Sequence, residues 1–163
     1  MVRVADRPID VERLARRLRA ERVRGWATVE LDRAEREVVL PRGWPRAIPA
    51  DDDLPLGATT RVASSPEGAE TIVLLEPVTE GLLAASLARH GEAFLVDYLL
   101  VAGPLDEAVR RAREEGLTLS ALSSGPFGPE RLAAGSPRWG PHLILAGRDR
   151  KPDRGTGAVT IET

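Results

Sequence analysis

The stretch TIVLLEPVTEGLLAASLARHGEAFLVDYLLV, residues 71 to 101, predicts how the chain is organised. It opens with a run of branched apolar residues that stops at Pro77, which has no amide hydrogen to donate to a neighbouring strand. Apolar residues at helical spacing follow, and Gly91 ends that predicted helix. Residues 94–101 form a second apolar run, interrupted only by Asp97. We therefore predict a strand, a helix and a strand that join two similar halves.

Each half reads as strand, helix, strand, strand, strand. The first half is predicted to begin with a strand at Val2–Ala5, a helix that Pro8 and Asp10 open and Gly25 ends, and a strand at Trp26–Leu31. A charged turn at Asp32–Glu37 and an irregular loop or lid at Pro41–Gly57 follow. The half closes with a hairpin of Thr59–Ser64 and Thr71–Glu76. The second half is predicted to contain strand Phe94–Val101, helix Leu105–Glu115 and strands Leu117–Leu122, Arg131–Ala134 and His142–Ala146.

This pattern predicts an α+β fold of two βαβββ modules. The expected divisions are residues 1–78 for the first module, 79–91 for a linker helix, 92–148 for the second module and 149–163 for a polar tail. Two such modules side by side would form a curved mixed sheet with helices on its outside.

Composition limits the possible functions. The chain has 163 residues, 42% of them hydrophobic, which suits one domain or two small modules around a shared core. A net charge of −2 gives no bulk electrostatic reason to expect nucleic acid as a partner. The chain has no cysteine, and its apolar runs are too short for a membrane span or a secretory signal. We expect a cytoplasmic protein.

The central stretch resembles the vicinal oxygen chelate superfamily, and in particular its methylmalonyl-CoA epimerase, glyoxalase and bleomycin-resistance branch. The resemblance rests on "IVLLEP", on "EGLLAASLARHGEAFLVDYLLV" and on the amphipathic "LDEAVRRAREEGLTL", so it is strongest over Thr71–Leu119. It implies the two-module fold, a small-molecule pocket inside the curve of the sheet, and a possible homodimer.

The resemblance also implies a divalent metal held by His, Glu or Gln side chains from four strands, where it would act as a Lewis acid. In this sequence those positions fall near Met1–Val2, at Val73, at Val96 and near Leu145, and all of them are apolar. His90 and His142 are the only histidines, and His90 belongs to the end of a predicted helix. We therefore predict a protein without a metal or another cofactor.

Side chains alternate along a strand, so the neighbours of Val73 and Val96 at even spacing share their face. If these valines point inward, they line an apolar pocket with one polar group, the hydroxyl of Tyr98. Such a pocket suits an extended hydrophobic or aromatic ligand. The predicted lining consists of Thr71, Val73, Leu75, Phe94, Val96, Tyr98, Leu100, Leu143 and Leu145.

Four residues are candidate acids or bases: Glu92, Asp97, Tyr98 and His142. Asp97 would point toward the helices and pair with an arginine from one of them, or, if the register slips by one residue, would enter the pocket as the acid or base. Glu92 would more simply hold the turn into its strand. His142 starts the last strand, where it would face the pocket or its rim.

Two tryptophans are candidate ligand contacts. Trp44, in the irregular loop, would cover a ligand or pack beneath the loop, and Trp139 would close over a ligand or face a partner subunit. The run Asp51–Asp53 in the same loop invites a metal interpretation. Adjacent carboxylates do not encircle an ion, however, so we interpret this run as a solvated loop.

These features favour a metal-independent enzyme, such as an isomerase, cyclase or lyase, that acts on a largely apolar small molecule in a biosynthetic pathway. The alternative is a non-catalytic small-molecule binding or self-resistance protein of the same fold. A structural or regulatory partner domain is a third possibility.

Overall fold

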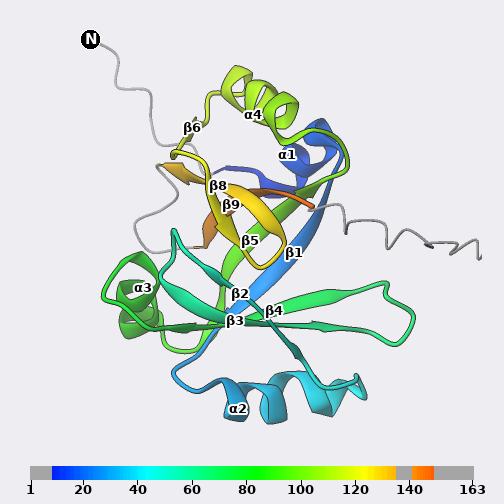
Figure 1. The fold of residues 1–163 in the computed structure, drawn as a ribbon, viewed down its shortest axis with the longest axis vertical. Helices are drawn as coiled ribbons and strands as arrows, with labels where there is room; N and C mark the ends of the chain where they lie inside the picture. Colours follow the sequence, from blue (N-terminus) through cyan, green and yellow to red (C-terminus); the bar gives the residue numbers. More distant parts are fainter. Residues whose placement is uncertain (1–8, 135–140, 149–163) are drawn as a thin grey trace, which may run out of the picture.

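A curved sheet of nine strands forms the centre of the molecule (Figure 1). The structure is a computed structural model that describes residues 9–134 and 141–148. Neighbouring strands follow the order β2-β3-β4-β1-β5-β9-β8-β6, and β7 also pairs with β8. The strands are β1 (Ala20–Ala27), β2 (Ile48–Asp53), β3 (Ala58–Ser64), β4 (Thr71–Pro77), β5 (Ala93–Val101), β6 (Thr118–Leu119), β7 (Ser123–Gly125), β8 (Gly128–Ala134) and β9 (His142–Gly147).

The pairing of the strands shows the predicted duplication. β1 runs parallel to β4 in the first half, as β5 runs parallel to β9 in the second, and the halves meet where β1 and β5 pair antiparallel. The predicted α+β fold with a curved mixed sheet is thereby confirmed. The helical segments are α1 (Val11–Leu18), α2 (Leu31–Ala34) with its continuations η1 (Glu35–Val39) and η2 (Leu40–Arg42), α3 (Leu82–His90) and α4 (Leu105–Glu114).

The first half begins later in the sequence than we predicted. Its first strand is β1, and Gly25 lies within that strand instead of ending a helix. The helix that packs on this half is α2 with η1 and η2, in the segment predicted to be a charged turn and the start of a loop. Its buried residues Leu31, Ala34, Glu35 and Val39 do follow helical spacing, but the charged residues among them led to the prediction of a turn. The predicted strand Val2–Ala5 lies outside the described residues.

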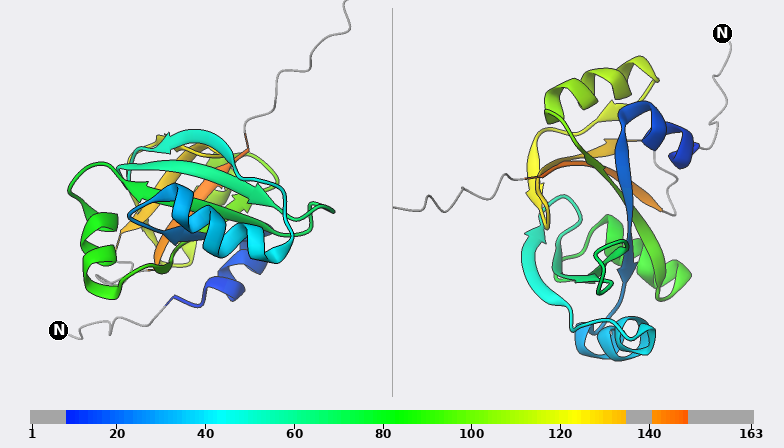
Figure 2. Two further views of the ribbon diagram at one scale, coloured as in Figure 1. Left: turned by 90° about the horizontal axis from the view of Figure 1, so that it is seen from below. Right: turned by 90° about the vertical axis from the view of Figure 1, so that its right-hand side faces the viewer.

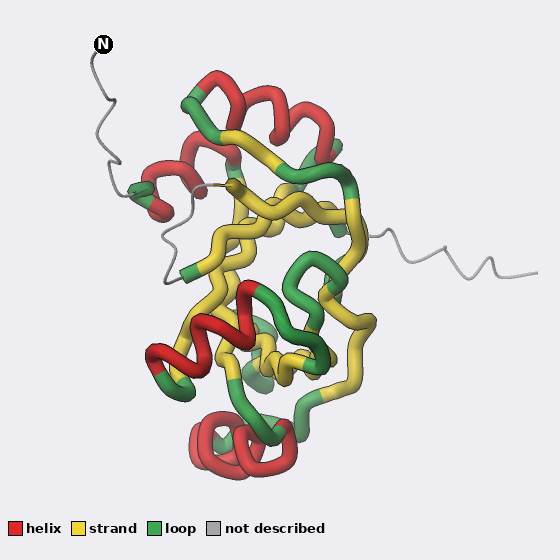
Figure 3. The backbone as a smooth tube through the Cα atoms, turned by 90° about the vertical axis from the view of Figure 1, so that its left-hand side faces the viewer, coloured by secondary structure: helices red, strands yellow, loops and turns green. Residues whose placement is uncertain are grey.

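Helix α1 is an additional element that precedes this half. Its start is capped by the Asp10 carboxylate, which accepts a hydrogen bond from the amide of Arg13 at 3.0 Å. Its apolar side packs with α4 over the outer face of the sheet, and α2 covers the other end of that face (Figure 1). Figure 3, seen from the side of α3, shows α3 between these two helical layers. None of the helices in the described part of the chain is long and apolar enough to cross a membrane.

The two faces of the sheet carry separate apolar clusters. The inner cluster lies on the concave side of the sheet. Figure 2 shows the ribbon of this sheet from two further directions. Two outer clusters lie beneath α1 with α4 and beneath α2. The buried members of the inner cluster are Val23, Ala27, Leu56, Ala58, Val73, Leu75, Leu83, Leu87, Leu95, Val96, Tyr98, Leu100, Ile144 and Ala146.

A β-bulge in β5 changes which residues face inward. Gly25 is paired with Val96 whereas Trp26 is paired with Phe94, so Leu95 is the extra residue. Leu95 therefore joins Val96 in the inner cluster, and Phe94 turns to the outer face. There the ring of Phe94 meets that of Trp26 edge-on at 5.1 Å, and the guanidinium of Arg24 lies 4.0 Å above it.

The curvature brings the two ends of the sheet together. At the end of β2, the amide of Leu54 donates a 3.1 Å hydrogen bond to the carbonyl of Ser124 in β7. Strand β2 was not predicted, because its segment was assigned to the irregular loop at Pro41–Gly57. The junction between β2 and β7 leaves the concave side enclosed by both halves of the chain.

Substitution of Gly25 by alanine tests the packing between β1 and its neighbours. A Cβ at this position would lie 2.7 Å from a methyl of Leu75 and 2.9 Å from the Cβ of Val96, so the core must shift. We expect Gly25→Ala to lower the free energy of unfolding by about 1–3 kcal/mol, as overpacking commonly does. Urea denaturation measures this, with Gly81→Ala as the control because a Cβ there meets open space. Equal stability of the two variants would contradict the described packing.

Candidate functional site

Two carboxyl groups and a phenol meet on the concave side of the sheet. Asp53 ends β2, Tyr98 lies in the middle of β5 and Glu130 lies in β8, so strands from both halves contribute. All three residues are 0% exposed. Buried carboxyl groups are costly, which makes this acid cluster, defined as Asp53, Tyr98 and Glu130, the candidate functional site.

Asp53 is the acceptor at the centre of the cluster. Its Oδ2 accepts a 2.6 Å hydrogen bond from the Tyr98 hydroxyl, and its Oδ1 accepts one of 3.2 Å from the amide of Leu56. Burial raises the pKa of Asp53, although the contact with Glu130 and these two hydrogen bonds oppose the shift.

Glu130 differs because no described donor reaches either of its carboxyl oxygens. Burial is the main cause that raises the pKa of Glu130 to about 10, and the charge of Asp53 and the proton shared with it add to the shift. The two carboxyl groups therefore titrate as a pair that retains one proton at neutral pH. That proton permits the contact, since two ionised carboxylates would repel each other.

Gly125 provides the space that the Glu130 carboxyl occupies. A Cβ at Gly125 would lie 2.1 Å from Oε2 of Glu130, so any larger residue would displace the carboxyl group. Gly125 pairs with Gly128 in the hairpin of β7 and β8, and β7 is the strand that meets β2. The same hairpin therefore closes the sheet and positions the acid.

The Tyr98 side chain remains a neutral phenol. Burial, followed by the charges of Asp53 and Glu130, raises the pKa of its hydroxyl well above its usual value, so this group donates to Asp53. Its ring meets that of Phe127 edge-on at 5.5 Å. Leu56, which is 1% exposed, belongs with Tyr98 to the inner apolar cluster. The protein's own side chains thus pack around the acid cluster.

A second polar contact on the concave side joins α3 to β9. Oγ of Ser86 lies 2.8 Å from Nε2 of His142, and both residues are buried. Burial lowers the pKa of His142, while a hydrogen bond with the backbone of Leu82 opposes the shift. Burial therefore favours the neutral form of the imidazole, and Ser86 is the partner of its Nε2.

The structure distributes the predicted lining residues over both faces. Val73, Leu75, Val96, Tyr98 and Leu100 lie in the inner cluster. Thr71 is half-buried at the start of β4, where its hydroxyl lies 3.1 Å from that of Ser64.

The predicted inward orientation of three residues is wrong. Leu143 and Leu145 lie in the outer cluster beneath α1 and α4, because β9 pairs with β5 in a register that turns His142, Ile144 and Ala146 inward. Phe94 faces outward because of the bulge at Leu95.

Asp97 also lies on the outer face, so it does not belong to the acid cluster. Its Oδ1 accepts a 2.8 Å hydrogen bond from Nε of Arg22. We predicted that this arginine would come from a helix. It comes instead from the neighbouring strand β1. The alternative in which Asp97 enters the interior is wrong, since its neighbours Val96 and Tyr98 face inward and it does not.

The Glu92 carboxylate binds residues of α2 and of the turn that precedes it. It accepts hydrogen bonds from the Thr28 hydroxyl, the Val29 amide at 3.0 Å and Arg33 at 2.6 Å. Burial acts to raise the pKa of Glu92, but these hydrogen bonds and the charge of Arg33 outweigh it and lower the pKa. Glu92 thus fastens the residue before β5 to the turn between β1 and α2, which is a different turn from the one predicted.

Trp44 packs against the outer cluster beneath α2, with the guanidinium of Arg42 at 5.4 Å from its ring, so it does not reach the interior. Trp139 lies outside the described residues. Of the expected metal positions, Met1–Val2 lies outside the described residues, Val73 and Val96 face inward and are apolar, and Leu145 faces outward. Across residues 9–134 and 141–148, no group of three or more His, Cys, Asp or Glu side chains could hold a metal ion.

Both carboxyl groups of the site were missed in the sequence. Asp53 was assigned to a solvated acidic run, in which Asp51 and Asp52 are indeed exposed whereas Asp53 is buried. A register shift between Ala50 and Asp53 breaks the alternation, so even a strand predicted over 48–53 would not have singled out Asp53. Glu130 lies two residues before Leu132, whose inward position makes an acid at 130 inward as well.

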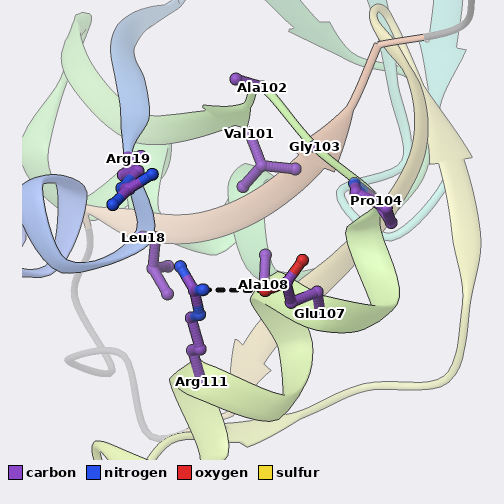
Figure 4. A pocket seen from close by; sticks show the side chains of 9 residues that line it. All are labelled: Leu18, Arg19, Val101, Ala102, Gly103, Pro104, Glu107, Ala108 and Arg111. Atoms are coloured by element: carbon purple, nitrogen blue, oxygen red, sulfur yellow. Dashed lines mark hydrogen bonds and ion pairs between the residues drawn. The ribbon is translucent and has the colours of Figure 1, made fainter.

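A cavity of ≈ 340 Å³ lies on the outer face between the ends of α1 and α4 (Figure 4). Its lining includes Leu18, Arg19, Val101 and Ala108. Arg111 and Glu107 also line it and form an ion pair of 2.7 Å with each other. The cavity is therefore separate from the acid cluster, and its lining contains one more arginine, Arg19, than acids.

Comparison with solved structures identifies the fold. The chain is similar to methylmalonyl-CoA epimerase from Mycobacterium tuberculosis, with 21% identity and a TM-score of 0.68 over 79% of this chain and 87% of that one. It is also similar to a Streptomyces coelicolor methylmalonyl-CoA epimerase variant in complex with 2-nitronate-propionyl-CoA, with 18% identity and a TM-score of 0.63 over 78% and 96% of the two chains. A hypothetical protein from Bacillus halodurans C-125 matches at 17% identity and a TM-score of 0.64 over 79% and 94%.

These likenesses show that the chain has the fold expected from its resemblance to vicinal oxygen chelate proteins. At this level of identity they establish the fold alone. No family model matches the chain, and no characterised protein sequence matches it.

The shared proton should make stability depend on pH. In the unfolded chain Glu130 titrates near 4.5, whereas in the folded protein its pKa is about 10, so the folded state binds an additional proton between these values. This stabilisation is complete below pH 4.5 and is lost as the pH rises toward 10, by up to about 1.4 kcal/mol per pH unit. Urea denaturation at pH 5, 7 and 9 should show a falling free energy of unfolding.

Glu130→Gln removes the titrating group and should flatten this dependence. Asp52→Asn is the matched control, because Asp52 is exposed beside Asp53 and its loss should leave the slope unchanged. The same slope in Glu130→Gln as in the wild type would contradict the shared proton.

Proposed function

We propose that the protein is an enzyme that moves a proton on a small organic molecule and that Asp53 and Glu130 are its base and acid. The observation that carries this proposal is the buried carboxyl pair that retains one proton at neutral pH. A carboxylate and a carboxylic acid in contact are the two forms that general base and general acid catalysis require. A reaction of the isomerase or lyase type fits this pair.

The proton count of such a reaction balances within the pair. Asp53 accepts a proton from a carbon of the substrate, and Glu130 donates its own proton to another position of the resulting anion. The pair again holds one proton, now on Asp53, and transfer between the touching carboxyl groups restores the starting state. Tyr98 holds Asp53 in place through its 2.6 Å hydrogen bond.

The similar structures support this class of reaction. Two of them are named epimerases, and an epimerase inverts a stereocentre, which at a carbon acid means removing and returning a proton. In this chain the two expected ligand positions that face inward, Val73 and Val96, are apolar. We therefore propose that the reaction uses the carboxyl pair and no metal ion.

A substrate would reach the pair at the junction of β2 and β7. Asp53 ends β2 beside this junction, and Gly125, against which Glu130 packs, ends β7. The hydrogen bond from Leu54 to Ser124 crosses the same boundary. Separation of these two strands exposes the pair without breaking the central pairing of β1 with β5.

A non-catalytic binding or self-resistance protein is the second candidate. The observation that favours it is the apolar character of the inner cluster, which suits contact with an apolar ligand that is bound and not transformed. A cytoplasmic location, a biosynthetic role and a homodimer remain predictions from the sequence, and the mass of the native protein tests the dimer.

The two candidates differ in whether a bound compound exchanges hydrogen with water. Native mass spectrometry of the purified protein should reveal a retained organic compound. That compound, incubated with the protein in D2O, should gain deuterium at one carbon. Asp53→Asn should slow this exchange by about 10²-fold or more, since it removes the base.

Asp52→Asn is the control for this experiment and should leave the exchange rate unchanged. An equal rate in Asp53→Asn and the wild type would overturn the assignment of Asp53 as the base. A compound that stays bound and gains no deuterium would favour the binding protein.

A further inference from the structure

The cavity between α1 and α4 has the size and the floor of a small-molecule site (Figure 4). Its volume of ≈ 340 Å³ falls in the range of about 300–1,000 Å³ that such sites occupy. Its floor is apolar, because Leu18, Val101 and Ala108 line it and are buried. It shares no lining residue with the acid cluster, so a ligand here is additional to the substrate of the proposed reaction.

The lining of this cavity has a net positive charge. Arg19, at the end of α1, and Arg111, from α4, face one acid, Glu107, so the charges sum to +1. Glu107 accepts a 2.7 Å hydrogen bond from one terminal nitrogen of Arg111. Among the ion pairs of the described residues, none includes Arg19. The guanidinium of Arg19 is therefore the group that a bound anion would neutralise.

Arg19 has a backbone conformation that its side chain disfavours. It is the C-cap of α1, with φ 51° and ψ 46°, and it is the one non-glycine residue of the described chain with a positive φ. Its amide closes the helix by donating to the carbonyls of Ala15 and Arg16, which glycine would do without the strain that a Cβ causes. Arg16 and Arg17 already place positive charge in the last turn, where the helix dipole favours it. The helix end alone therefore does not account for an arginine here.

Gly103 lines the same cavity and shows the reverse mismatch. Its φ lies outside the left-handed region, and a Cβ added to it would meet no atom within 4 Å. Neither the backbone nor the packing requires a glycine at 103, yet a glycine there leaves space in the cavity. Thus an arginine stands where the fold favours glycine, and a glycine stands where the fold accepts a side chain. Local mismatches of this kind concentrate at functional sites.

We propose that this cavity binds a small organic monoanion, namely a carboxylate on an apolar body. The carboxylate neutralises the net charge of the lining and accepts hydrogen bonds from Arg19, whose planar guanidinium matches the two carboxylate oxygens. The apolar body packs on the floor of Leu18, Val101 and Ala108. Organic cations are disfavoured, because two guanidinium groups repel them. This site does not depend on the acid–base reaction proposed for the acid cluster.

Benzoate, benzyl alcohol and benzylamine test the proposal, because they share a ring and differ in charge. Each is titrated into the isotope-labelled full chain at pH 7 and low, constant ionic strength, and heteronuclear NMR measures the dissociation constant and locates the contact. Benzoate should shift the amide signals of Val101, Gly103 and Ala108, and should bind about three- to fivefold more tightly than benzyl alcohol, as a partly exposed ion pair permits. Benzylamine should leave these signals unmoved, and acetate, which lacks the ring, should bind more weakly than benzoate.

Two substitutions in the lining should act in opposite directions. Arg19→Gly removes a guanidinium and should weaken benzoate binding about three- to fivefold. Because glycine also relieves the left-handed strain, urea denaturation should show a variant at least as stable as the wild type. Glu107→Gln removes the carboxylate that competes for Arg111 and should tighten benzoate binding by a similar factor.

Arg13→Ala and Glu114→Gln are the matched controls. Arg13 is exposed on α1, and Glu114 is exposed on α4, where it pairs with Arg110. Neither residue lines the cavity, although each substitution changes the net charge as its counterpart does. Both variants should bind benzoate with the dissociation constant of the wild type.

Three outcomes would overturn the proposal. The first is a benzoate titration that shifts none of the three cavity amides. The second is binding of benzyl alcohol or benzylamine at these amides as tight as that of benzoate. The third is a benzoate dissociation constant that Arg19→Gly changes no more than Arg13→Ala does. None of these outcomes bears on the exchange experiment with Asp53→Asn, so the proposed function is tested separately.

Discussion

One proton shared between Asp53 and Glu130 permits two carboxyl groups to lie in contact inside the curved sheet. Burial disfavours the ionised form of each group, and the charge of one raises the pKa of the other, so the pair keeps a proton at neutral pH. Tyr98 then has a fixed partner, since its hydroxyl can only donate. The contact between strands of the two halves inside the curved sheet depends on this proton.

The duplicated architecture makes the contact possible. Asp53 and Glu130 come from different halves of the chain, and they meet because the sheet curves until β2 approaches β7. Local details then adjust the faces of the sheet. The bulge at Leu95 directs Phe94 outward while Val96 stays inward, and the glycine at 125 leaves room for the carboxyl of Glu130. The fold that results is similar to that of the epimerase structures.

The elements that could be predicted from sequence are those with a regular hydrophobic period. Residues 71–101 and the α4 segment meet this condition, and the structure places strands and helices there. The first half was harder, because the charged residues of α2 and η1 suggested a turn and the acidic residues of β2 suggested a loop. Tyr98 could be found by alternation from Val96. Asp53 and Glu130 could not be recognised as a pair, because their contact depends on how far the sheet curves, and no local pattern encodes that distance.

Infrared spectroscopy tests the shared proton most directly. A protonated carboxylic acid has a C=O stretching band that is separate from the bands of carboxylates and amides. The wild-type protein at pH 7 should show this band, and Glu130→Gln should lose it while Asp52→Asn retains it. A wild-type spectrum without a carboxylic acid band at pH 7, or a band that persists in Glu130→Gln, would contradict a proton held between Asp53 and Glu130.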